Sequence, residues 1–182
     1  GATAISARDF LIAYNVNLNT TSTRRANAVA YDIREKGRIK RVGEVLSGAI
    51  VKDADGNTLW TPGKLKHVKA IGWYIEEYGV TQVTMNITNI TETPLHLAFD
   101  ETANAANARG IRATGSELVG LVPKSAMLEA GKYFLRKQNR STGIHESELI
   151  KIAIKSMGLD ELGPFIPEER IIEYMLESGT DK

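Results

Sequence analysis

Residues 10–20 have the sequence FLIAYNVNLNT, which predicts a β-strand with two chemically different faces. Alternate residues of an extended strand point to opposite sides of a sheet. One side of this stretch is an unbroken apolar row, namely Phe10, Ile12, Tyr14, Val16 and Leu18. The other side becomes polar halfway along, with Asn15, Asn17 and Asn19. We therefore expect this strand to bury one face in a core and to present amides on the other.

Residues 80–89, VTQVTMNITN, repeat this pattern, because Gln82, Thr84 and Asn86 alternate with apolar residues. If the two strands are neighbours, their polar rows form a floor of uncharged hydrogen-bonding groups on one side of the sheet. Burying such a group without a partner costs about 1–3 kcal/mol. The floor is therefore expected to contact water, a ligand or a partner domain.

The composition is that of an ordinary globular chain. The 182 residues, of which 42% are hydrophobic and 25% charged, suit one domain, or one domain with an appendage. The net charge of +1 creates no overall field for nucleic acid or membrane. The chain has no cysteine, which excludes disulfides and thiolate zinc sites and is compatible with the cytoplasm, where we expect the protein.

The order of the expected elements predicts a fold class. Residues 10–20, 67–77, 80–89 and 112–122 have strand patterns, and residues 21–36 and the segment from Pro94 to Gly110 have helical ones. The resulting order βαββαβ is typical of a ferredoxin-like α+β fold, here spanning residues 10–122. In that fold the first and third strands are central and both helices cover one face of the antiparallel sheet.

Three segments lie outside this pattern. Residues 1–9 are expected to be a lead-in from a preceding subdomain, since the chain opens on Gly1 rather than Met and is expected to be a piece of something longer. Residues 38–66 are predicted to be a basic β-hairpin insertion that turns at Asp55-Gly56. Residues 123–182 are predicted to be a C-terminal helical extension with helices at 123–138 and 145–157 and a last short one from Pro167.

The sequence contains no self-sufficient catalytic set. His67, His96 and His145 are far apart and lack metal-binding spacing, and His96, which lies off the apolar stripe of its helix, is expected on the surface. No metal site is expected. Asp53, at the start of a sequence that imitates a calcium loop, is better explained by the hairpin turn, because Lys64 stands where such a loop needs its glutamate.

Two groups of charged residues have open interpretations. Glu117 is either an edge-strand charge that opposes aggregation or part of the polar floor. A basic cluster is either a solvated loop or a rim that attracts a polycarboxylate ligand; its members are Arg38, Lys40, Arg41, Lys64, Lys66 and Lys69.

Four blocks of the sequence are similar to a known family. They are GATAISARDFLIAYNVNL, KHVKAIGWYIEEYGVTQVTMNITN, GSELVGLVPKSAM and GLDELGPFIPEERIIEYML, in that order. Together they resemble the C-terminal subdomain of glutamate formiminotransferase, which is fused to a cyclodeaminase in formiminotransferase-cyclodeaminase. The resemblance implies transfer of a formimino group between N-formimino-L-glutamate and tetrahydrofolate, in histidine breakdown.

The resemblance also implies what this chain contributes. The catalytic histidine of the family belongs to the N-terminal subdomain, so we expect no catalytic residue here and an inactive chain when isolated. Expected partners are that subdomain, a cyclodeaminase domain and a second copy in a homo-oligomer. The expected residues for binding substrate and folate are Arg8, Asn15, Asn17, Lys66, Lys69, Gln82, Thr84, Asn86 and Glu117.

Two other functions remain open at this point. The fragment could be an assembly module, with the polar floor as a dimer or subdomain interface and the helices after residue 123 as a dock for the cyclodeaminase. It could also be a free-standing ligand sensor.

Overall fold

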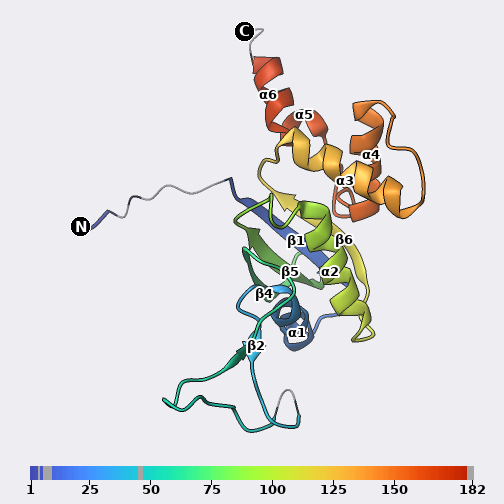
Figure 1. The fold of residues 1–182 in the computed structure, drawn as a ribbon. Coiled ribbons are helices and arrows are strands. Elements are labelled where there is room, and N and C mark those ends of the chain that lie inside the picture. Colours follow the sequence, from blue (N-terminus) through green and yellow to red (C-terminus); the bar gives the residue numbers. More distant parts are fainter. Residues whose placement is uncertain (4, 6–9, 45–46, 180–182) are drawn as a thin grey trace.

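The computed structural model describes residues 1–3, 5, 10–44 and 47–179, and it is a mixed α/β structure (Figure 1). The strands are β1 (Ile12–Leu18), β2 (Arg38–Ile39), β3 (Trp60–Thr61), β4 (Val68–Ile75), β5 (Val80–Ile87) and β6 (Ala113–Val119). The helices are α1 (Thr23–Ile33), α2 (Leu95–Asn107), α3 (Lys124–Lys137), α4 (Glu146–Met157), α5 (Pro167–Arg170) and α6 (Ile172–Gly179). The predicted four-stranded antiparallel sheet with accompanying helices is confirmed.

The main sheet has the strand order β4-β5-β1-β6, and each neighbouring pair is antiparallel. Strands β1 and β5 are therefore the central pair, and they carry the two polar rows. Asn15 of β1 lies opposite Thr84 of β5 on one side and Glu117 of β6 on the other. This register brings the polar side chains of three strands onto the same face.

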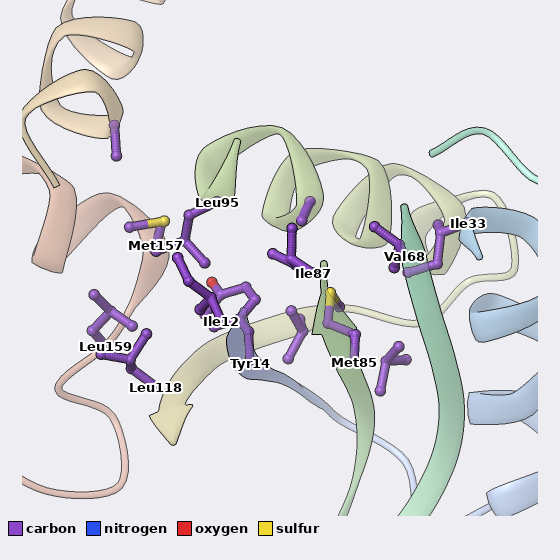
Figure 2. Close-up of a cluster of buried hydrophobic side chains, with 14 of the residues drawn as sticks. Ile12, Tyr14, Ile33, Val68, Met85, Ile87, Leu95, Leu118, Met157 and Leu159 are labelled. Atoms are coloured by element: carbon purple, nitrogen blue, oxygen red, sulfur yellow. The ribbon is translucent and has the colours of Figure 1, made fainter. Parts of the chain in front are cut away.

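The apolar row of β1 forms the centre of the core. Ile12, Tyr14, Val16 and Leu18 are all fully buried, and they pack with the buried faces of α1 and α2. Figure 2 shows Leu95 of α2 pointing towards Ile12 and Tyr14. Helices α1 and α2 thus cover the apolar face of the sheet, and the polar rows face the other way.

The helices after β6 complete the same core. Buried residues of α3 and α4, including Met127 and Met157, belong to the cluster that contains the β1 row. The final helix predicted from Pro167 is wrong as a single element, because α5 and α6 are separated at Ile171. Ile171 is extended, buried and bridged to Val122 of the chain before α3, so a backbone pairing interrupts the helix.

Residues 38–44 and 47–66 extend from the sheet at the end opposite α3–α6 (Figure 1). The short β2–β3 ladder is followed by bridges between Arg41 and Ile50 and between Lys52 and Thr58. At the tip, Asp53 accepts hydrogen bonds from the backbone N–H groups of Asp55 and Asn57. These bonds lower the pKa of Asp53, with the Asn57 N–H making the largest contribution. The carboxylate therefore stabilises a turn.

Among the described residues, no helix is both long enough and apolar enough to cross a membrane.

The outer edge of β4 is partly closed by a side chain of α1. The Asn27 amide accepts from the Gly72 N–H at 3.0 Å and donates to the Gly72 C=O at 3.2 Å. A Cβ at Gly72 would clash with the backbone of Asn27, so glycine permits this close approach. Because open strand edges recruit other strands, the Asn27 amide also opposes edge-to-edge association.

We expect Asn27→Ala to lower the free energy of unfolding by about 1–3 kcal/mol, since it leaves two backbone groups of Gly72 unpaired. Urea denaturation measures this change. Asn104→Ala, at an exposed position of α2, is the matched control because it makes the same change in helix propensity. Equal stability of the two variants would contradict the role assigned to Asn27.

His96 is half-buried between α2 and α3, so its expected surface position is wrong. Its ring stacks on Tyr133 with centroids 4.3 Å apart. Burial lowers the pKa of His96, Glu129 and Asp100 oppose this shift, and Arg136 adds to it. The folded state therefore favours the neutral ring.

The unfolded chain binds a proton at His96 more readily than the folded chain does. The contribution of His96 to the free energy of unfolding is therefore fully present above the unfolded pKa of about 6.5 and decreases as the pH falls below it. His96→Phe should remove this dependence while keeping the ring stack. Thermal unfolding between pH 5 and pH 7.5 tests this expectation. His145→Asn, which keeps an N-cap acceptor on α4, should retain the dependence. An unchanged pH profile in His96→Phe would contradict the assignment.

Candidate functional site: the polar face of the sheet

The candidate site lies on the face of the sheet that α1 and α2 do not cover. The structure brings seven of the expected binding residues to this face through the strand register: Asn15, Asn17, Lys69, Gln82, Thr84, Asn86 and Glu117. Lys66 is exposed just before β4, and Arg8 lies outside the described residues.

Glu117 organises the centre of this face. Its Oε2 atom accepts a hydrogen bond from Asn15 Nδ2 at 3.1 Å and another from Gln82 Nε2 at 3.1 Å. Gln82 Nε2 also donates to Asn17 Oδ1 at 2.8 Å. Of the two interpretations of Glu117, the structure supports the polar floor, with the carboxylate tied to both central strands.

Glu161, which the sequence did not indicate as a site residue, continues the network. Its Oε2 atom accepts a hydrogen bond from Asn17 Nδ2 at 2.6 Å. The segment carrying Glu161 is held along β6, because the Ser116 N–H donates to the Gly158 C=O at 2.9 Å. Gly115 allows this approach, since a Cβ there would clash with Glu161 and lie 2.7 Å from the Gly158 oxygen.

Two features of the floor differ from the expectation. First, it is not uncharged, because Glu117 and Glu161 take part in it. Second, its centre is not open: Asn17 is 0% and Gln82 1% exposed. Amides without acceptors would be costly at that depth, and the two carboxylates supply them. The parts of the floor that remain accessible lie towards β4 and, on β6, at the half-buried Glu117.

The accessible part towards β4 combines polar and apolar side chains. Asn86 and Lys69 are exposed and lie opposite each other, and Thr84 is half-buried. Beside them on β4, Ile71 is 46% and Trp73 57% exposed. This arrangement offers hydrogen bonds and a flat apolar surface together, as small-molecule and domain interfaces require.

A cavity of about 190 Å³ adjoins the network along β6. Glu117, Tyr78, Phe165 and Arg170 are among the residues that line it, and Leu162 to Pro164 complete part of its wall. It therefore combines an anchored carboxylate, two aromatic rings and a guanidinium group.

Much of the basic cluster has structural partners. Arg38 forms an ion pair with Asp32, and Lys64 Nζ lies 2.9 Å from Glu101 Oε2. Arg41 donates to the Gly48 C=O at 2.7 Å. These three cations thus hold the described parts of this segment, residues 38–44 and 47–66, together and against the helices.

The chemistry available on this face is binding and orientation. The described residues contain no group of three or more His, Cys, Asp or Glu side chains that could hold a metal ion. Of the described histidines, His96 is on α2, on the opposite layer, and His67 and His145 precede β4 and α4. The fold and this face thus define an α/β domain whose sheet has one helix-covered apolar face and one polar, partly exposed face.

Comparison with known proteins identifies the family. Residues 13–177 match the formiminotransferase domain, and the chain belongs to this family. It is 41% identical over 181 residues to formimidoyltransferase-cyclodeaminase of Gallus gallus, covering 100% of this chain and 30% of that protein. The corresponding protein of Sus scrofa is 38% identical over 183 residues, with 100% and 30% coverage. Glutamate formimidoyltransferase of Thermoplasma acidophilum is 33% identical over 154 residues, which is 84% of this chain and 43% of the relative.

This chain therefore spans less than half the length of these relatives. The family resemblance read from the four sequence blocks is confirmed.

Glu161→Ala should destabilise the protein by about 1–3 kcal/mol, because the buried Asn17 amide loses its acceptor. Glu161→Gln, which retains an acceptor oxygen, should lose less stability than Glu161→Ala. Chemical denaturation of both variants and of Glu76→Ala, an exposed carboxylate in the β4–β5 turn, measures the difference. If Glu161→Ala and Glu76→Ala were equally stable, the contact between Asn17 and Glu161 would not support the floor.

Proposed function

We propose that this chain is the substrate-binding and folate-binding half of a glutamate formimidoyltransferase. In this proposal the whole protein transfers a formimino group between N-formimino-L-glutamate and tetrahydrofolate in histidine catabolism. The sheet is a ferredoxin-like unit in which residues 38–66 are an insertion and residues 123–182 an extension. The protein acts in the cytoplasm as part of a longer polypeptide or assembly.

The observation that carries this proposal is the polar face opposite the helices, in a chain that belongs to the formiminotransferase family. A pteridine is flat and has several hydrogen-bonding groups at its edge. Trp73 offers a surface for stacking, and Thr84 and Asn86 lie on the neighbouring strand. Lys69, beside Asn86, would contact a carboxylate of glutamate or of the folate tail.

The role of this half is positioning. Holding two reactants in the correct geometry supplies several kcal/mol of the barrier reduction without any proton transfer. The general acid or base comes from the N-terminal subdomain of the transferase, which closes over the polar face. The isolated chain is accordingly inactive, and its other partners are a cyclodeaminase domain and a second copy.

Asn86→Ala is the sharpest test of folate binding, since Asn86 is exposed and forms no side-chain hydrogen bond with the rest of the described chain. Losing one hydrogen bond to tetrahydrofolate, at about 1 kcal/mol, should weaken binding roughly fivefold. Calorimetric titration of the full-length protein measures this affinity. Lys52→Ala, in the 38–66 segment, is the control. Unchanged folate affinity in Asn86→Ala, or no formimino transfer by the full-length wild-type protein, would contradict the proposal.

A second candidate function is an assembly module, and the exposure of Ile71 and Trp73 favours it. Large apolar side chains on an otherwise polar face are typical of protein interfaces. If assembly were the only role, Trp73→Ser would dissociate the complex in sedimentation experiments while Asn86→Ala left folate binding intact. If the face binds folate, both substitutions should weaken that binding.

A further inference from the structure

The two carboxylate oxygens of Glu117 have different surroundings. Oε2 receives the hydrogen bonds from Asn15 and Gln82, whereas Oε1 has no hydrogen-bond partner among the described residues. Glu117 is half-buried and lines the 190 Å³ cavity along β6. The amides thus fix the position of the carboxylate through one oxygen, and the other remains available to a ligand.

The orientation of the amides determines what this ligand can be. Gln82 directs its NH₂ group to Asn17 and Glu117, Asn15 donates to Glu117, and Asn17 donates to Glu161. Amide donors are therefore directed at protein acceptors, and two carboxylates contribute negative charge. Such a surface favours N–H donors and cations over carboxylates. The expectation that Asn15 and Asn17 bind substrate or folate directly does not fit this arrangement, because their amide donors are already used by Glu117 and Glu161.

The other walls of the cavity indicate the shape of the ligand. Tyr78 and Phe165 are aromatic, and the face of an aromatic ring attracts a planar cation. Arg170 lines the same cavity, and no ion pair within the described residues joins it to Glu117. The cavity therefore offers an anion and a cation to one small molecule.

We propose that Glu117 binds a planar amidinium group through its free oxygen, and that Arg170 faces a carboxylate of the same molecule. The identification of the biological ligand rests on the proposed function, because the formimino group of N-formimino-L-glutamate is an amidine that becomes an amidinium when protonated. No covalent change is involved in this binding.

Titration of the protein with formamidinium chloride, followed by NMR of the side-chain NH₂ signals of Asn15 and Gln82, tests the proposal. Formamide, which has nearly the same shape but no charge, is the comparison probe. Because charged hydrogen bonds are the stronger ones, formamidinium should bind at least about tenfold more tightly than formamide. Glu117→Gln should remove this preference, whereas Glu92→Gln, an exposed carboxylate before α2, should keep it.

Equal affinity of the wild-type protein for formamidinium and formamide would overturn the proposal. This comparison needs no variant, so it remains decisive even if Glu117→Gln does not fold. Formamidinium binding that survives in a folded Glu117→Gln would also overturn it. A transferase assay separates this inference from the proposed function. Absence of turnover by the full-length wild-type protein contradicts only the function, while an unchanged KM for N-formimino-L-glutamate in an active full-length Glu117→Gln variant contradicts only the inference.

Discussion

The alternation of apolar and amide side chains along β1 constrains both sides of the molecule. Because β1 is hydrogen-bonded to β5 on one edge and to β6 on the other, it cannot rotate about its own axis, and its apolar and amide rows stay on opposite faces of the sheet. The apolar side requires a helical layer, which α1 and α2 provide. The amide side requires acceptors, because Asn17 is fully buried and an unpaired amide at that depth is costly. The carboxylates of Glu117 and Glu161 meet this requirement, and their positions follow from it.

Much of the fold could be predicted because local periodicity determines it. The 3.6-residue spacing of Ala26, Val29, Ala30 and Ile33 matches the buried face of α1, and Gly158, in the left-handed conformation, ends α4. Predictions failed where a distant contact overrides the local pattern. Ile171 fits a helical stripe, but its pairing with Val122 holds it extended. His96 looks exposed on a helical wheel, but Tyr133 of another helix covers it.

The site was predictable to the same extent. Asn15 and Gln82 could be placed together because strand order and alternation fix their neighbours, whereas the sequence left Glu117 open between an edge-strand charge and the floor. Glu161 could not be placed, since it is separated from Asn17 by 144 positions and lies in a loop without periodic pattern. Gly115 and Gly158, which make room for that loop, are individually ordinary glycines in the sequence. Only the contact between Gly115 and Gly158 in the folded structure shows that both glycines allow the loop to approach β6.

The path through Glu161 connects the polar face to the helices that follow β6. Met157 and Leu159 are buried in the same core as Ile12, and the Ser116 hydroxyl donates to the Met157 C=O at 2.7 Å. Residues 157–161 therefore belong at once to the core, to the edge of β6 and to the network beneath the cavity. A shift of α4 along β6 would move Glu161 and withdraw the acceptor from Asn17. Asn17 accepts a hydrogen bond from Gln82, which also donates to Glu117. Displacement of α4 would thus change the position of the Glu117 carboxylate in the cavity. The two are coupled because hydrogen bonds hold one side of the 157–161 loop and apolar burial holds the other.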